Sequence, residues 1–207
     1  MIGLTQYYIR TFRPAFNAFL TRLLYSGRVK IGKNFRTDSI PRILVDKGCK
    51  VVIGNDVEFR RNIEIRAHNG AKIEIGDHCR IDRSVRMLST NNSMISLGRR
   101  TRIGLNTVLN GGGNITTGEK CLISGYVYLQ TSMHAFNLQF KSVQDQGYDH
   151  APVELKEDCW LGTHVVVMPG VTLGKGSVVG SNAVVTKSVD DFHVVGGIPA
   201  KTLKERS

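Results

Sequence analysis

The sequence lacks several features that would assign it to common classes of protein. Only 4 of its 207 residues are cysteines, and no small-residue cleavage site of the kind that ends a secretory signal peptide follows the first apolar segment. We therefore expect reduced thiols and a cytoplasmic protein. No segment rich in proline, serine or charge divides the chain, which favours a single domain.

Acidic residues are also scarce. The chain has 17 Asp and Glu against 28 Lys and Arg, which gives a formal net charge of +11. Such a surface favours an anionic partner: membrane lipid, a phosphorylated cofactor or an acidic polymer. Nucleic acid is not expected, because no binding motif is present and the basic residues alternate along a repeat described below. A solvated outer face is the remaining interpretation.

Residues 1–28 form a segment that differs from the rest of the chain. Its apolar residues recur at near-helical intervals: Ile2, Leu4, Ile9, Phe12, Phe16, Phe19, Leu20, Leu23 and Leu24. Arg10, Arg13 and Arg22 are interspersed, and together with Pro14 they argue against a membrane span. The segment is predicted either to cap the open end of a solenoid or to lie peripherally on an anionic membrane at its inner face.

An aliphatic residue recurs at every sixth position in the C-terminal part of the chain. These positions are Leu155, Leu161, Val167, Leu173, Val179 and Val185. An amphipathic helix repeats near 3.6 residues and a half-buried strand repeats at 2, whereas a six-residue period is typical of parallel β-helices. The chain is therefore predicted to be an all-β protein built around such a solenoid.

Upstream, the same six-residue period recurs, but each turn of the solenoid, or rung, is longer. Segments that start at residues 53, 75 and 97 are 22 residues apart, which is three hexapeptides plus four residues that bulge at one corner. About twenty residues are inserted at about 133–152, and an insertion of that length is either functional or disordered. About seven rungs are predicted within residues 29–195, roughly 33 Å tall at a strand spacing of ~4.8 Å, and residues 196–207 form a C-terminal tail.

Small residues are expected four places after an aliphatic residue of this repeat, facing inward. Cys79, Cys121, Cys159 and Thr101 occupy such places, where cysteine packs as a compact hydrophobe. Thr117 stands where an aliphatic residue is expected, which predicts a distorted rung beside the insertion.

One histidine lies where the regular wall opens into the inserted loop. His134 follows directly after the rung that ends near Met133, and loops on a rigid scaffold commonly carry function. A neutral imidazole at working pH suits a general base. The other histidines lie at corners or outward places, apart from His150 at the far end of the insertion.

Three motifs resemble those of the hexapeptide-repeat acyltransferases. They are TSMHAF at 131–136, the repeat at 152–189 and GGIPAK at 196–201. The resemblance is to maltose and galactoside acetyltransferases and to O-acetyltransferases of bacterial surface polysaccharides. It covers residues 97–201 closely and the upstream rungs loosely.

This resemblance implies a left-handed parallel β-helix that forms a homotrimer, with acetyl-CoA as co-substrate between neighbouring copies and no metal. His134 corresponds to the catalytic base that takes a proton from an acceptor hydroxyl, which attacks the thioester directly. A backbone N–H near Gly162 and Thr163 would stabilise the oxyanion. The residues implied along the CoA arm are Gly162, Thr163, Gly180, Ser181, Thr186, Lys187, Pro199 and Lys201.

Three residues are candidates for acceptor binding. Trp160 corresponds to a tryptophan beside the acceptor pocket, or it simply packs at a corner. Asn106 and Asn110 are alternative positions for an asparagine that orients the acceptor, because the glycines of NGGGN at 110–114 shift the alignment.

The function expected from the sequence is acetyl-CoA-dependent O-acetylation of a sugar hydroxyl in a capsule, O-antigen or exopolysaccharide, or in its precursor. The alternatives are a xenobiotic acetyltransferase of the streptogramin or chloramphenicol type and a non-catalytic β-helix scaffold. A metal-dependent hydratase would require three histidines to converge, and His134, His150 and His164 are the nearest set.

Overall fold

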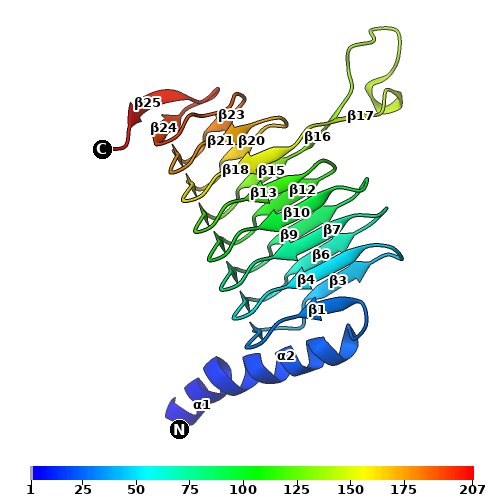
Figure 1. Cartoon of the computed structure of the whole chain (residues 1–207), viewed down its shortest axis with the longest axis vertical. Coiled ribbons are helices and arrows are strands. Elements are labelled where there is room, and N and C mark those ends of the chain that lie inside the picture. Colours follow the sequence, from blue (N-terminus) through cyan, green and yellow to red (C-terminus); the bar gives the residue numbers. More distant parts are fainter. Residues whose placement is uncertain (1) are drawn as a thin grey trace.

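The computed structural model describes residues 2–207, apart from the side chains of Ile2, Gly3, Leu4 and Arg10. Expectations for Met1 and for those side chains lie outside the described residues. A helical segment crosses one end of a tall stack of parallel strands, and the C-terminus lies at the other end (Figure 1).

Three sheets form the faces of a prism, and each rung contributes one strand to each sheet. Sheet A consists of β1 (Val29–Ile31), β4 (Lys50–Ile53), β7 (Lys72–Ile75), β10 (Met94–Leu97), β13 (Ile115–Thr117), β18 (Val153–Leu155) and β21 (Thr172–Leu173). Sheet B consists of β2 (Arg36–Thr37), β5 (Glu58–Phe59), β8 (Arg80–Ile81), β11 (Arg102–Ile103), β14 (Leu122–Ile123), β19 (Trp160–Leu161), β22 (Val178–Val179), β24 (His193–Gly196) and β25 (Lys201–Glu205). Sheet C consists of β3 (Arg42–Val45), β6 (Glu64–Ala67), β9 (Arg86–Ser89), β12 (Val108–Gly111), β15 (Tyr128–Gln130), β20 (Val166–Val167) and β23 (Val184–Val185). The predicted fold class, a left-handed parallel β-helix of about seven rungs, is confirmed.

The strand register follows the sequence repeat. Val51 pairs with Ile73, and Ile73 pairs with Ile95, so equivalent aliphatic residues stack one rung apart. All three are fully buried, because inward positions of successive rungs form continuous apolar columns. Thr117 interrupts one column without the expected distortion. It keeps regular register with Leu97, and its Oγ1 accepts a hydrogen bond from the Gly98 N–H at 3.0 Å.

The inward places predicted for small residues are buried. Cys79, Cys121, Cys159 and Thr101 are at most 1% exposed, and all four cysteines are free thiols. Burial raises the pKa of Cys79 to about 11. Cysteine therefore acts here as a packing residue.

The insertion is more ordered than an excursion loop. Its two ends pair as an antiparallel hairpin of β16 (Ser132–His134) and β17 (Tyr148–His150). A 3-10 turn, η2 (Val143–Asp145), lies within the connection. The hairpin projects away from the solenoid (Figure 1).

The N-terminal segment comprises α1 (Ile2–Tyr7), the π-helix η1 (Tyr8–Phe12) and α2 (Arg13–Leu24). It lies across the first rung, where the Asn17 side chain donates to the Asp38 carbonyl at 2.9 Å and Arg22 donates to the Gly32 carbonyl at 2.6 Å. Among the residues the structure describes, no helix is both long enough and apolar enough to span a bilayer.

The C-terminal residues close the other end. Strand β25 pairs antiparallel with β24, and the turn between them hydrogen-bonds to the last strand of sheet C. There the Ala200 N–H donates to the Val184 carbonyl, and the Val184 N–H donates to the Gly197 carbonyl.

Candidate functional site

Most of the predicted site residues lie along or beside two different edges of sheet C. The B–C edge is the stack of turns that lead from sheet B into sheet C, including residues 162–165 and 180–183. The C–A edge is the stack of turns that lead from sheet C into sheet A, including residues 111–114 and the hairpin.

His134 lies on the hairpin at the C–A edge. It is the last residue of β16 and pairs with Tyr148, whose ring lies 4.1 Å from the imidazole between centroids. The side chain is exposed, and its ring forms no hydrogen bond with any described residue. One aromatic neighbour therefore positions the imidazole while both ring nitrogens remain available to a substrate.

His150 is held more firmly at the base of the same hairpin. Its Nδ1 lies 2.9 Å from Ser132 Oγ, and its Nε2 lies 3.3 Å from Asn91 Nδ2. A Cβ at Gly112 would lie 1.9 Å from Ser132 Oγ and 2.7 Å from His150 Nδ1. A larger residue there would displace the side chains of Ser132 and His150. This contact explains one of the glycines in the NGGGN segment.

Asn110 supports the hairpin from the rung below. It lies in β12 beside Gln130, and its side chain donates to the Tyr128 hydroxyl at 3.0 Å. Its carbonyl accepts a hydrogen bond from Thr131 Oγ1 at 2.5 Å, directly before β16. Asn106, the alternative candidate, occupies a left-handed turn position on the B–C edge. The two asparagines therefore belong to different edges.

The turns of the B–C edge form hydrogen bonds to the neighbouring rung at alternate backbone N–H groups. The Gly162 N–H donates to the Val179 carbonyl at 2.8 Å, so it is not available to an oxyanion. The Thr163 N–H forms no hydrogen bond with the described residues, and the Thr163 hydroxyl donates to the Gly125 carbonyl at 2.9 Å. Of the two N–H groups predicted as oxyanion donors, only that of Thr163 is free.

The same arrangement recurs one rung further along this edge. Gly180 donates its N–H to the Val195 carbonyl, whereas the Ser181 N–H has no partner among the described residues. Gly162 lies against Ser181, because a Cβ at Gly162 would lie 2.6 Å from the Ser181 nitrogen. Four of the predicted CoA-arm residues thus form one continuous surface.

Aromatic stacking, which the repeat pattern does not predict, stabilises this edge. Tyr126 and His164 occupy equivalent left-handed positions on successive rungs, and their rings stack at 4.7 Å with an interplanar angle of 5°. One rung and the whole insertion separate the two residues in the sequence, so the repeat pattern does not indicate that they are neighbours. His164 therefore lies across sheet C from His134, so the three histidines of a hydratase site do not converge within one chain.

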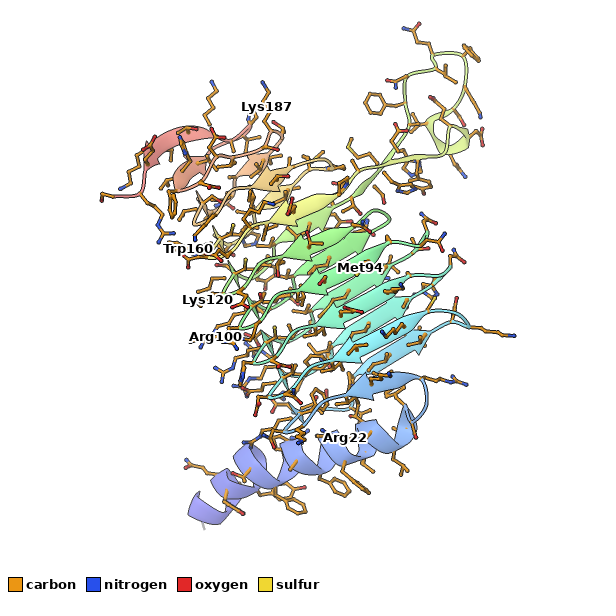
Figure 2. All side chains as sticks on the ribbon, in the orientation of Figure 1. Arg22, Met94, Arg100, Lys120, Trp160 and Lys187 are labelled. Carbon is orange, nitrogen blue, oxygen red and sulfur yellow. The ribbon has the colours of Figure 1, made fainter. Side chains whose placement is uncertain are left out.

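The remaining predicted CoA residues lie at the C-terminal end of the prism. Thr186 and Lys187 follow the last strand of sheet C, and Lys187 is exposed there (Figure 2). Pro199 lies in the turn between β24 and β25, and Lys201 begins β25; both are exposed. Thr186 and Lys187 lie in the turn that leads from β23 to Val189, which bridges to Leu173 of sheet A, so they belong to the C–A edge. Pro199 and Lys201 lie by the turn that hydrogen-bonds to Val184, next to the last rung of the B–C edge.

Trp160 lies on the outer face of sheet B. It is 51% exposed, and its indole N–H points to Ser124 Oγ at 3.4 Å. A groove of about 560 Å³ runs beside it, with Lys120, Lys204 and Arg206 among its lining residues. Trp160 and the hairpin lie on opposite sides of the prism (Figures 1 and 2). Within one chain Trp160 is therefore remote from His134.

The last regular rungs of the solenoid resemble a known family. Residues 152–187 match the family model described as bacterial transferase hexapeptide (six repeats). This segment is a transferase hexapeptide repeat. The predicted resemblance to the hexapeptide-repeat acyltransferases is confirmed.

One similar curated protein comes from Mycobacterium tuberculosis, where it is named a probable acetyltransferase. It is 34% identical over 104 residues, which are 50% of this chain and 35% of that protein. The chain spans at most about half the length of the first curated relatives that it matches.

Two solved structures show how widely the fold is shared. AntD, an N-acyltransferase from Bacillus cereus solved with dTDP and 3-hydroxybutyryl-CoA, has a TM-score of 0.58 at 20% identity, covering 91% of this chain and 88% of that one. A galactoside acetyltransferase solved with coenzyme A has a TM-score of 0.56 at 25% identity, covering 63% and 64%. The AntD likeness shows the fold alone.

Proposed function

We propose that this protein is an acetyl-CoA-dependent O-acetyltransferase that acts on a sugar hydroxyl. The observation that carries the proposal is the exposed imidazole of His134, which lies on an ordered hairpin and forms no hydrogen bond to described residues through either nitrogen. The repeat at residues 152–187 and the likeness to a galactoside acetyltransferase solved with coenzyme A support it.

The geometry suits direct transfer. His134 takes the proton from the acceptor hydroxyl as its oxygen attacks the thioester carbonyl carbon. The Thr163 N–H donates to the oxygen that gains negative charge. The C–S bond then breaks, and the imidazolium returns the proton to the departing thiolate, which leaves as CoA thiol. No acyl-enzyme forms.

A homotrimer is the assembly that completes this site. His134 lies on the C–A edge and the Thr163 N–H on the B–C edge, with sheet C between them. A cyclic assembly brings the C–A edge of one copy against the B–C edge of the next. Each active site then uses His134 from one copy and Thr163 from its neighbour, and CoA lies in the cleft between them.

The acceptor we propose is a bacterial surface polysaccharide or its precursor. Tyr148 and Trp160 offer exposed aromatic faces of the kind on which sugar rings stack. The net charge of +11 favours an anionic polymer over a neutral sugar. Asn110, fixed by Tyr128 below the hairpin, is the better placed asparagine to orient the acceptor near His134.

Release of free thiol from acetyl-CoA tests the proposal. We expect an acidic polysaccharide to accelerate release over background hydrolysis, and mass spectrometry to detect an O-acetyl ester on the sugar. A rate unchanged by every saccharide would contradict the proposed acceptor class. Acceleration by chloramphenicol or a streptogramin alone would instead support a xenobiotic acetyltransferase, and failure to bind immobilised CoA would support a non-catalytic scaffold.

A further inference from the structure

The N-terminal helical segment exposes its bulky apolar side chains. Five of them, called here the aromatic face, are Tyr8, Phe12, Phe16, Phe19 and Leu23, with exposures of 53%, 53%, 49%, 61% and 65%. Their spacing places them along one side of the helix. The rings of Tyr8 and Phe12 stack at 5.6 Å, and those of Phe12 and Phe16 at 6.0 Å. The apolar surface is therefore continuous.

The opposite side of the helix is the one that contacts the solenoid, and it is built from small residues. Pro14, Ala18 and Thr21 are the buried residues of α2. A segment that only capped the first rung would direct its aromatic rings inward and its polar residues to water, because that arrangement buries the most apolar surface. The observed arrangement is the reverse. The helix covers the rung and leaves a second apolar surface unpartnered.

Charge indicates what covers this surface. No acidic residue precedes Asp38, whereas the first 37 residues contain seven basic ones: Arg10, Arg13, Arg22, Arg28, Lys30, Lys33 and Arg36. Two copies that met through this segment would bring like charges together, which opposes self-association. An anionic lipid surface offers both an apolar layer and the complementary charge.

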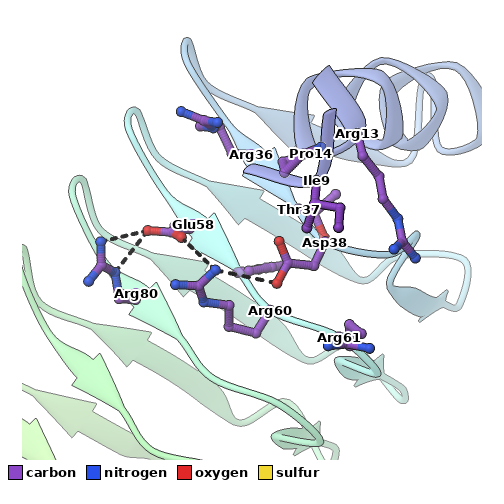
Figure 3. Close-up of a pocket in the computed structure, with 11 residues that line it drawn as sticks. Ile9, Arg13, Pro14, Arg36, Thr37, Asp38, Glu58, Arg60, Arg61 and Arg80 are labelled. Atoms are coloured by element: carbon purple, nitrogen blue, oxygen red, sulfur yellow. Dashed lines mark hydrogen bonds and ion pairs between the residues drawn. The ribbon is translucent and has the colours of Figure 1, made fainter. Parts of the chain in front are cut away.

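A basic groove lies directly beside the helix (Figure 3). It has a volume of about 630 Å³, and five arginines line it: Arg13, Arg36, Arg60, Arg61 and Arg80. Its two carboxylates are already paired, Asp38 with Arg60 at 3.4 Å and Glu58 with Arg80 at 2.7 Å. Arg13 and Arg61 form no ion pair among the described residues. The groove therefore retains unneutralised positive charge.

We propose that the aromatic face is a membrane-docking surface for anionic lipids. The helix lies in the plane of the bilayer with Phe12, Phe16 and Phe19 at the boundary of headgroups and acyl chains. Arg13 and Arg61 face the headgroup phosphates from the adjoining groove. The solenoid then stands end-on at the membrane, with the hairpin at the side of the prism several rungs away.

Co-sedimentation of the full chain with vesicles tests this surface. Vesicles of phosphatidylcholine alone are compared with vesicles that also contain phosphatidylglycerol. We expect about tenfold stronger partitioning onto the anionic vesicles, weakened by salt. Phe16→Glu combined with Phe19→Glu should reduce partitioning about tenfold or more. The matched control is Phe140→Glu, an exposed aromatic residue on the hairpin loop, which should bind as the wild type does.

Insertion depth provides a second readout. In a Phe16→Trp variant, brominated acyl chains should quench the new tryptophan, whereas the wild type, whose single tryptophan is Trp160, should show little quenching. Circular dichroism of each variant checks that the solenoid is folded. Both readouts are independent of thiol release, so a failure of the docking surface is distinguishable from a failure of the proposed reaction.

Three results would overturn the proposal. The first is no binding to anionic vesicles, and the second is binding that the double substitution does not reduce. The third is a wild-type assembly mass that falls when Phe16 and Phe19 are replaced, because the aromatic face would then be an interface between copies of this chain.

Discussion

The two edges of sheet C differ in almost every physical respect. At the B–C edge successive turns stack tightly, because a Cβ at Gly162 would lie only 2.6 Å from the Ser181 backbone nitrogen. At the C–A edge the chain leaves the solenoid and forms a hairpin that carries His134, the candidate base. The His134 side chain is exposed and forms no hydrogen bond with the described residues. One edge is a rigid wall with fixed N–H groups, and the other carries a base that is open to substrate.

This difference shows how a repetitive solenoid acquires a site. Repetition places equivalent backbone N–H groups one rung apart. Among the described residues, those of Thr163 and Ser181 are not used in hydrogen bonds between rungs, so they are available as donors. Repetition offers no convergent side chains, because equivalent positions on successive rungs point the same way. The base is therefore expected from an interruption, and in the proposed trimer the two parts meet across neighbouring copies.

The largest expected effect comes from removing the base at the C–A edge. His134→Ala should lower turnover by about 10² or more, because general acid–base catalysis typically contributes 10²–10⁴. The melting temperature should not change, since the side chain is exposed and forms no hydrogen bond with described residues. The control is His68→Ala, a corner histidine in an early rung, which should retain wild-type turnover. Equal losses in both variants would contradict the role of His134.

A smaller effect is expected from crowding the B–C edge. Gly162→Ala places a Cβ 2.6 Å from the Ser181 nitrogen, so the free energy of unfolding should fall by about 1–3 kcal/mol. Gly180→Ala, one rung away, meets its nearest atom at 3.4 Å and should cost less than about 1 kcal/mol. Denaturant unfolding measures both. A similar loss of unfolding free energy in the two variants would mean that the B–C edge is not rigid at Gly162.

The smallest effect concerns the A–B edge, the stack of turns that lead from sheet A into sheet B, including residues 76–79. This edge serves as a reference because it carries no candidate site residue. Cys79 lies there, and burial raises the pKa of its thiol from 9.0 to about 11. The folded chain thus holds this proton more tightly, so the stabilisation is present below pH 9 and is lost as pH rises towards 11. The free energy of unfolding should fall by about 1–2 kcal/mol more in the wild type than in Cys79→Val between pH 8 and pH 10.5. An identical pH dependence in the two proteins would contradict this assignment.

Much of the scaffold was predictable from the sequence because the six-residue period encodes it directly. The 22-residue rungs, the inward cysteines and the insertion all follow from counting aliphatic residues. The expected distortion at Thr117 was wrong, because a hydroxyl in the aliphatic column found hydrogen-bond partners in Gly98 and Thr101. A pattern of apolar residues carries no information on such local polar contacts.

The details of the site were less predictable because they depend on contacts between segments far apart in the chain. The Tyr148 ring packs at a tilt against His134 across a hairpin that the length of the insertion did not reveal. The neighbouring rung determines which N–H groups are hydrogen-bonded: its Val179 carbonyl accepts from the Gly162 N–H, and no carbonyl of a described residue reaches the Thr163 N–H. The helix was predicted as amphipathic, yet its burial pattern is inverted, because a periodic pattern does not say which side faces the solenoid.

Mixing two inactive variants tests the central claim, that one site is built from two edges on two copies. His134→Ala removes the base, and Ser181→Trp obstructs the exposed B–C edge of an otherwise intact chain. After co-expression, random mixing in a trimer should restore about a quarter of the wild-type rate of thiol release, because one site in four pairs an intact His134 with an intact Ser181. Each variant alone should remain inactive. A mixture that stays as inactive as its parents would show that each site lies within a single chain.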